Sequence, residues 1–319
     1  MSARSIIALP VLLMLLMVAD VAASAPVDVI VYPSFGFGST AAIEGRVIAQ
    51  EARDEHQADD GRRQNLQRNL QLLVNKELAD VKVIVSIGNL TWNAVTDAEG
   101  YFRIDIREEN FLSPGWHAVS AQAPTDTGSG SLLMVPAVNV QGVISDFDDT
   151  VVISEVNRFF RLLGHSLLKN PQQREPVLGM ADAYARLIGS NPQAGAAPLF
   201  YLSASPRQLQ ASIQSFLDYN GFPRGVLITK RVTNDDTSDP LRNQVRYKTE
   251  KLVDIFERLP NVRFTLVGDD GEQDPEIYRA VQQRYPERVA AIWIRRVHPD
   301  PRRVRIEGQG DVADLLKTP

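Results

Sequence analysis

The sequence predicts an α/β protein in which a β-rich, sandwich-like domain precedes a parallel sheet flanked by helices. Up to about residue 140, short runs rich in β-branched and aromatic residues alternate with turn residues. After Gly142, apolar strands alternate with longer amphipathic helices, a pattern typical of a parallel sheet. The chain has 319 residues, of which 44% are hydrophobic and 23% charged, so it is long and apolar enough for two folded domains.

Residues 1–25 are typical of a secretory signal peptide. A charged start precedes the apolar run Ile6–Ala19, and small residues follow up to Ala25. The apolar run is shorter than the ~20 residues that a membrane span needs, so a signal cleaved after Ala23 or Ala25 is favoured over an anchor. We therefore expect an exported protein, either periplasmic or secreted. The sequence has no cysteine, which excludes disulfides and thiolate chemistry.

Residues 26–140 form the predicted β-rich domain. Residues 62–78 interrupt the strand pattern with leucines at helical intervals, which predicts one inserted amphipathic helix. Residues 96–100 have the composition of a tight hairpin turn. No catalytic pattern is visible in this domain. The predicted strands are Val27–Tyr32, Ala42–Ala49, Val81–Ile87, Gly100–Ile106, Trp116–Gln122 and Leu132–Val138.

Residues 141–319 form the predicted α/β domain, whose strands are short apolar runs and whose helices have a 3.6-residue period. The predicted strands are Gly142–Ser145, Leu199–Leu202, Val226–Ile228, Arg263–Val267 and Ala290–Ile294. The predicted helices are Glu155–Lys169, Met180–Ile188, Pro206–Tyr219, Lys248–Arg258 and Pro275–Tyr285.

Four polar clusters follow these strands or open a helix. They are Asp146–Thr150, Ser203–Ser205, Lys248 and Gly268–Asp274. Ligands of open α/β sheets bind just beyond the carboxyl ends of the strands, so the four clusters are expected to converge in one crevice. A single pair of aspartates after a strand would be weak evidence, because acidic residues are common in loops. Four clusters in this order indicate a functional site.

The chemistry of these residues suits a phosphate ester and a hard cation. Asp146 and Asp148 are two residues apart, which places both carboxylates on one side of an extended chain, and Asp269 is a natural third ligand. Mg²⁺ prefers such oxygen ligands. An aspartate beside a metal can attack phosphorus, and the second can act as acid and then as base. The Ser203 hydroxyl and the Lys248 ammonium are expected to bind phosphoryl oxygens, and Thr150 either joins them or locks the loop.

The run Asp146-Phe147-Asp148-Asp149-Thr150 resembles the first motif of the haloacid dehalogenase superfamily of phosphatases, and Ser203, Lys248 and Asp269 resemble the motifs that follow. The sequences that flank these motifs narrow the resemblance to the App1-type phosphatidate phosphatases. The catalytic domain of that family is similar to residues 175–180, 201–206, 221–223 and 268–276, and its companion domain is similar to residues 32–36, 44–47 and 72–77.

The resemblance implies a Rossmann-like haloacid dehalogenase-type sheet and a role for each site residue. Asp146 is the implied nucleophile and Asp148 the implied acid and base. Asp146, the backbone carbonyl of Asp148 and Asp269 would hold Mg²⁺, with Asp274 behind them. Relatives typically have serine where this chain has Asp270, so Asp270 is an alternative ligand or a neighbour of the metal.

The implied substrate is phosphatidate, hydrolysed as a phosphate monoester to diacylglycerol. Two alternatives stay open: an exported phosphatase for soluble sugar phosphates or nucleotides, and a binding module with a vestigial site. The net charge of −5 argues against nucleic acid as a partner. Peripheral membrane contact is suggested by an apolar stripe in 159–168, although such a stripe more often packs into a core. The protein partner of the β-rich domain is not indicated.

Overall fold

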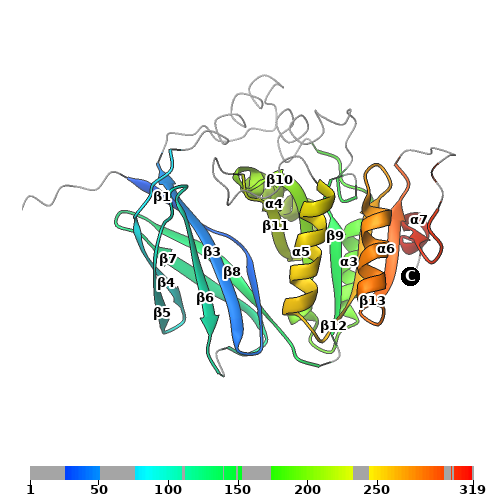
Figure 1. The fold of residues 1–319 in the computed structure, drawn as a ribbon, viewed down its shortest axis with the longest axis horizontal. Coiled ribbons are helices and arrows are strands. Elements are labelled where there is room, and N and C mark those ends of the chain that lie inside the picture. Colours follow the sequence, from blue (N-terminus) through cyan, green and yellow to red (C-terminus); the bar gives the residue numbers. More distant parts are fainter. Residues whose placement is uncertain are drawn as a thin grey trace, which may run out of the picture.

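The computed structural model describes residues 26–50, 76–109, 112–138, 140–148, 150–152, 174–232, 244–297, 303 and 305–317. Two sheets lie side by side, and the helices flank the second of them (Figure 1). No helix within these ranges is long and apolar enough to cross a membrane. The predicted signal peptide, the predicted helix at 155–169 and the apolar stripe in 159–168 fall outside the described residues.

The first sheet, here called the β-rich region, has eight strands in the order β1-β3-β2-β8-β7-β4-β5, with β6 paired to β3. Burial alternates along several of its strands, so one face of each of these is apolar, as in Val27–Val31 and Lys82–Ile87. These faces form a single hydrophobic cluster that includes Val29, Ile43, Val85 and Leu132. The strands are β1 Val27–Val31, β2 Ser34–Phe37, β3 Thr40–Ala49, β4 Lys82–Ile87, β5 Leu90–Val95, β6 Tyr101–Arg107, β7 Gly115–Gln122 and β8 Thr127–Val135.

Two of these strands were not predictable from the sequence pattern. Strand β2 has only four residues, between Pro33 and the turn at Gly38. Strand β5 ends the sheet and leaves most of its residues exposed, so it shows no apolar alternation. The predicted helix at 62–78 is wrong at its end, because Glu77 forms a β-bridge with Ile48. Its residues up to 75 are outside the described ranges.

The predicted turn at 96–100 is tight, but it does not join two paired strands. The Asp97 side chain accepts hydrogen bonds from the backbone N–H groups of Glu99 and Tyr101, at 3.0 and 2.9 Å. The strands on either side then diverge, since β5 pairs with β4 and β6 pairs with β3. The turn therefore connects strands with different pairing partners rather than a hairpin.

The second sheet, here called the α/β region, has six strands in the order β11-β10-β9-β12-β13-β14, all parallel. This confirms the predicted α/β class, with a parallel sheet beside a β-rich region. Every predicted strand of this region is present. The strands are β9 Val140–Asp146, β10 Leu199–Pro206, β11 Val226–Lys230, β12 Val262–Asp269, β13 Val289–Arg295 and β14 Gly310–Asp311.

Amphipathic helices flank this sheet, and each buries its apolar side against the strands. Helix α5 begins four residues before the predicted Lys248, so Lys248 lies inside its second turn rather than at its start. Strand β14 and helix α7 were not expected, because they are only two and four residues long. The helices are α3 Met180–Gly189, η2 Ala194–Ala196, η3 Arg207–Leu209, α4 Gln210–Tyr219, α5 Gln244–Arg258, α6 Asp274–Arg284 and α7 Val312–Leu315.

The strand order places a topological switch point between β9 and β12. From β9 the chain adds β10 and β11 on one side, then crosses back to add β12, β13 and β14 on the other. At such a point the loops leaving the two neighbouring strands run in opposite directions, which opens a crevice at their carboxyl ends. Asp146 ends β9 and Asp269 ends β12, so the two aspartates flank this crevice.

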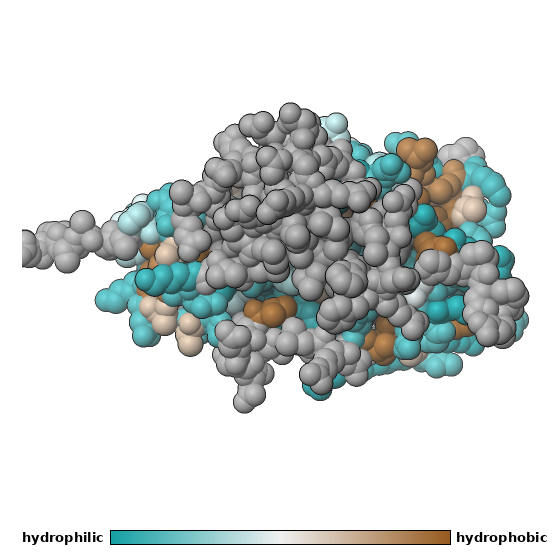
Figure 2. All heavy atoms as spheres, turned by 90° about the horizontal axis from the view of Figure 1, so that it is seen from above, coloured by the Kyte–Doolittle hydropathy of each residue, from teal (hydrophilic) through white to brown (hydrophobic). Residues whose placement is uncertain are grey.

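The two regions are joined by aromatic and ionic contacts. The Phe35 ring meets Phe200 edge to face at 5.0 Å, and the Arg258 guanidinium donates to the Phe35 carbonyl at 2.7 Å. Two ion pairs cross the interface at 2.6 Å, Arg207 with Glu44 and Arg231 with Asp97. Seen from above, the visible described surface is mainly hydrophilic, and its apolar residues stand in separate groups (Figure 2).

Glu44 makes the stability of this interface dependent on pH. Burial alone would raise the pKa of Glu44, but ion pairs with Arg207 and Arg103 lower it from 4.5 to about 2. A carboxyl with a lowered pKa stabilises the fold above its ordinary pKa, and that stabilisation disappears as the pH falls through the folded-state value. We expect Glu44→Gln to lower the free energy of unfolding by ~2 kcal/mol at pH 7. In urea titrations between pH 7 and 3, the difference from the unmodified protein should shrink below pH 4.5; a constant difference would contradict this account.

Candidate active site

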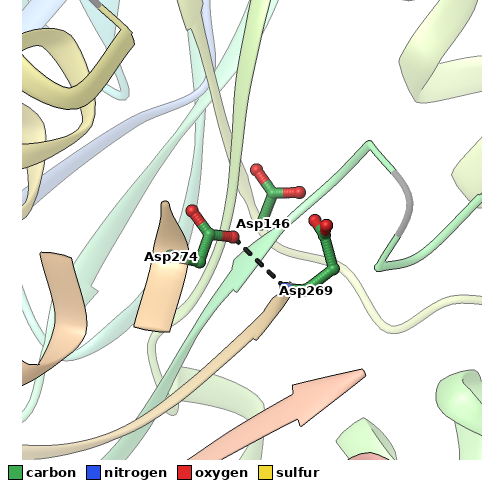
Figure 3. A group of neighbouring side chains, drawn as sticks. All are labelled: Asp146, Asp269 and Asp274. Atoms are coloured by element: carbon green, nitrogen blue, oxygen red, sulfur yellow. Dashed lines mark hydrogen bonds between the residues drawn. The ribbon is translucent and has the colours of Figure 1, made fainter. Parts of the chain in front are cut away.

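Three buried aspartates meet at the switch point. Asp146 ends β9, Asp269 ends β12 and Asp274 begins α6, and their side chains point toward one another (Figure 3). One carboxylate oxygen from each lies within 4.8 Å of the others. Asp274 also accepts a hydrogen bond from the Asp269 backbone N–H at 3.4 Å. The three are 3%, 1% and 0% exposed, so their charges are largely removed from water.

Gly268 permits the close approach of Asp274 to β12. A Cβ atom at position 268 would lie 2.5 Å from the Asp274 Oδ2 atom and 2.8 Å from its Cβ atom. Neither contact is sterically acceptable. The glycine before Asp269 is therefore required by the geometry of the carboxylate group.

Lys248 supplies a buried positive charge to this group. Its ammonium lies 2.8 Å from Asp146 Oδ1, 2.6 Å from Asp274 Oδ1 and 3.3 Å from Glu272 Oε2. The lysine itself is 2% exposed. Burial would lower its pKa, but the attraction of Asp146, Asp274 and Glu272 raises it well above the ordinary value, so the side chain is charged.

Asp148 and Ser203 form the other side of the site. The Ser203 hydroxyl donates to Asp148 Oδ2 at 3.0 Å and accepts from the Ser205 backbone N–H at 3.1 Å. These serines lie within β10, not after it, and Tyr247 holds this strand end by donating its hydroxyl to the Ser203 carbonyl at 3.1 Å. Thr150 is completely buried, and within the described ranges its hydroxyl has no hydrogen-bond partner. The structure therefore brings Ser203 to Asp148, two residues beyond Asp146.

The remaining acidic candidates differ in their surroundings. Asp274 belongs to the three-carboxylate group and binds Lys248 directly. Asp270 accepts from the Val297 backbone N–H at 2.9 Å and pairs with Arg296 at 3.4 Å. Its carboxylate thus binds the chain that follows β13, and it is not a member of the three-carboxylate group.

Crowding and burial of like charges shift the proton equilibria of the carboxyls. Burial raises the pKa of Asp146 well above its ordinary value, with Lys248 opposing and the neighbouring aspartates reinforcing this effect. Burial and the charge of Asp274 raise the pKa of Asp269 to about 8. Burial also raises the pKa of Asp148 to about 6, although its hydrogen bond from Ser203 acts in the opposite direction. Lys248 alone therefore does not keep all of these carboxyls ionised near neutral pH.

This donor set fits a hard divalent cation. The oxygen atoms of Asp146, Asp269 and Asp274 are close enough to share one ion, and no nitrogen or sulfur donor belongs to the group. Mg²⁺ selects oxygen ligands and is usually held by one or two carboxylates. A bound cation would also offset the repulsion that raises the carboxyl pKa values.

Sequence reasoning missed two residues of the site. Arg174 is buried, donates to the Ser212 hydroxyl at 3.3 Å and acts electrostatically on Asp148. Burial lowers the pKa of Arg174 to about 10, and Asp148 opposes this effect. Glu272 is the third carboxylate beside the Lys248 ammonium. Nothing in the sequence pattern around Arg174 distinguishes it from a surface arginine. Glu272, in contrast, lies within the polar cluster Gly268–Asp274 that the sequence already indicated.

The fold and the site together define an α/β protein with a buried, lysine-bearing carboxylate site at a sheet switch point. Residues 141–296 match the family described as phosphatidate phosphatase APP1, catalytic domain. This part of the chain therefore belongs to the App1-type catalytic domain family, which confirms the resemblance seen in its motifs.

Two curated relatives support this assignment. An uncharacterized protein of Schizosaccharomyces pombe is 27% identical over 217 residues, which cover 66% of this chain and 35% of the relative. Phosphatidate phosphatase APP1 of Saccharomyces cerevisiae is 28% identical over 154 residues, which cover 48% of this chain and 25% of that protein. The matched part thus spans only about a quarter to a third of these relatives.

One solved structure that aligns with most of the chain resembles it only weakly. A carbohydrate acetylesterase from Xanthomonas citri, XAC1771, aligns with 82% of this chain and 66% of its own length, at 8% identity and a TM-score of 0.29. That score is too low to indicate a shared fold.

Proposed function

We propose that the protein is a magnesium-dependent phosphomonoester hydrolase that acts through an aspartyl phosphate on Asp146. The observation that carries this proposal is the position of Asp146, which ends a strand at the switch point with its carboxylate 2.8 Å from the Lys248 ammonium. Membership of the App1-type family supports the same reaction class. The haloacid dehalogenase-type arrangement of the sheet is part of this proposal.

Asp146 is the proposed nucleophile because its carboxylate is held by the Lys248 ammonium and lies in the crevice between β9 and β12. Its oxygen would form a bond to phosphorus as the bond to the leaving alcohol breaks. Asp148 is the proposed acid, which gives the alcohol oxygen its proton. It then acts as base on the water that attacks the phosphorus of the aspartyl phosphate, which regenerates Asp146. The pKa of about 6 for Asp148 suits both roles near neutral pH.

The phosphoryl oxygens would be bound by Lys248 and Ser203. The ammonium and the hydroxyl face the site from α5 and from the end of β10. Such fixed donors stabilise the charge that develops as phosphorus is attacked. The buried Thr150 hydroxyl is a further candidate donor to the phosphoryl group, since no described residue binds it.

Mg²⁺ would be held by Asp146 and Asp269, with the Asp148 backbone carbonyl as a further ligand and Asp274 bound to Lys248 beside them. When bound, the ion supplies positive charge that reduces the repulsion between the nucleophile and the phosphate. We expect Asp269→Asn to weaken Mg²⁺ binding at least ~10-fold. Calorimetric titration with MgCl₂ measures this directly, and Asp182→Asn, at an exposed position on α3, is the matched control. Equal affinities in the two variants would remove Asp269 from the ligand set.

The proposed substrate is phosphatidate, and the proposed location is outside the cytoplasm, because residues 1–25 have the pattern of an export signal. The substrate proposal is supported by the printed name of the yeast relative. We expect faster hydrolysis of phosphatidate in mixed micelles with MgCl₂ than of glucose 6-phosphate or a nucleoside monophosphate at equal concentration. Hydrolysis of the soluble esters alone would instead favour the soluble-substrate alternative. No hydrolysis of any ester would favour the binding module.

A further inference from the structure

We propose that Arg207 is a positioning residue for the proposed phosphatase site, because it ties the carboxyl end of β10, residues 203–206, to Glu44 of the β-rich region. The two regions would then work as one catalytic unit, in which the β-rich region fixes the strand end that binds phosphate. This inference rests on the proposed function.

Arg207 is held from both regions. It follows the last residue of β10, and its Nη2 atom lies 2.6 Å from Glu44 Oε2 on β3. Its Nε atom donates to the Thr229 carbonyl on the neighbouring strand β11 at 3.5 Å. The guanidinium also lies over the Tyr32 ring, 4.9 Å from its centre. Few directions are left in which this side chain can move.

Glu44 is itself fixed. Arg103, on β6 of the same region, contacts the other carboxylate oxygen of Glu44 at 2.5 Å. The carboxylate therefore bridges one arginine of each region. A partly buried ion pair of this kind contributes little net stability compared with apolar residues in its place. It nevertheless favours one arrangement of the two regions, because moving one partner leaves the other charge buried and unpaired.

A second ion pair holds the adjacent strand end. Arg231 follows Lys230, the last residue of β11, and pairs with Asp97 at 2.6 Å. Its guanidinium lies 4.2 Å from the centre of the Tyr101 ring. Asp97 is fixed by its own tight turn. The β-rich region thus binds the chain just beyond both β10 and β11, at the carboxyl ends of the strands, where the site lies.

The path from Arg207 to the reacting groups is short. Arg207 lies four positions after Ser203, whose hydroxyl meets Asp148 at 3.0 Å. The Ser205 backbone N–H also donates to the Ser203 hydroxyl at 3.1 Å. A displacement at Arg207 would therefore reach the Ser203 hydroxyl through the last residues of β10. A shift of about 1 Å in a positioned group can cost roughly 100-fold in rate.

The test compares Arg207→Gln with Arg258→Gln in the full chain. Arg258 also joins the two regions, since it donates to the Phe35 carbonyl at 2.7 Å and lies over the Phe35 ring, but it sits at the other end of α5 from Lys248. We expect Arg207→Gln to lower kcat at least ~10-fold with a smaller change in KM, and Arg258→Gln to leave kcat within about twofold. Arg207→Lys should recover part of the loss.

Hydrogen exchange supplies a readout that does not need turnover. Arg207→Gln should speed the exchange of the backbone amides at 203–205, whereas Arg258→Gln should not. If the unmodified protein hydrolyses no ester, the proposed function fails, while exchange still decides whether Arg207 positions the end of β10. Unchanged exchange and kcat in Arg207→Gln would overturn the positioning role, and so would equal losses in both arginine variants.

A double-mutant cycle locates the effect. If Arg207 acts through Ser203, then Arg207→Gln should lower kcat much less in a Ser203→Ala background than in the unmodified protein. Full additivity of the two losses would mean that Arg207 acts elsewhere, and the inference would be wrong.

Discussion

Asp146→Asn is expected to lower magnesium-dependent hydrolysis of a phosphate monoester by roughly 10³-fold or more. An asparagine amide has nearly the shape of the carboxylate but cannot form the aspartyl phosphate. The fold should survive, because the substitution removes one of three crowded, buried negative charges whose pKa values burial has raised. Steady-state kinetics measure the loss, and thermal unfolding checks the fold.

Asp182→Asn, which makes the same chemical change at an exposed site on α3, should keep full activity. Beryllofluoride supplies a second readout, since with MgCl₂ it mimics a phosphoryl group on a carboxylate. It should protect the unmodified protein against thermal unfolding but not the Asp146→Asn variant. If Asp146→Asn hydrolyses the ester at the original rate, the assigned mechanism is wrong.

Lys248→Met is expected to reduce both stability and activity. Methionine fills a similar volume but leaves Asp146, Asp274 and Glu272 without the ammonium that lies between them. Breaking a buried ion pair from one side typically costs about 3 kcal/mol or more. Activity should fall at least ~100-fold, because the charge that binds the phosphoryl group is lost as well.

The stability loss in Lys248→Met should depend on pH in a defined direction. Without the ammonium, the buried carboxyl pKa values rise further above those of the unfolded chain. A group with a raised pKa costs no stability below its unfolded value, and the cost grows as the pH rises toward the folded value. Urea titrations should therefore show a deficit that is large at pH 8 and small near pH 4. Lys251→Met, one turn later on α5, is the control, and a deficit independent of pH would contradict this explanation.

The strands and helices of the α/β region were largely predictable, because they are buried on regular faces. Strands such as β10 are apolar along most of their length, and α3 repeats its apolar residues at helical spacing. Short or exposed elements carry too few apolar residues to show a period. Strands β5 and β14 and helix α7 were missed for this reason.

The site was predictable where a motif and a strand end coincide, as at Asp146 and Asp269. Contacts made by residues distant in sequence were not. The sequence does not indicate that Glu44 reaches Arg207 across the interface, or that Asp270 binds the backbone after β13 instead of joining the other carboxylates. Such pairings depend on how the two sheets and their loops are placed in three dimensions.

Gly268 offers a way to sort related sequences by eye. Because a side chain at this position would overlap Asp274, a relative that keeps all three aspartates in this arrangement must also keep the glycine. A relative with the aspartates but a bulkier residue here would have to move Asp274, and with it the start of α6, away from β12. The residue at this position thus distinguishes chains that can assemble this carboxylate site from chains that keep the aspartates of the motif without the arrangement.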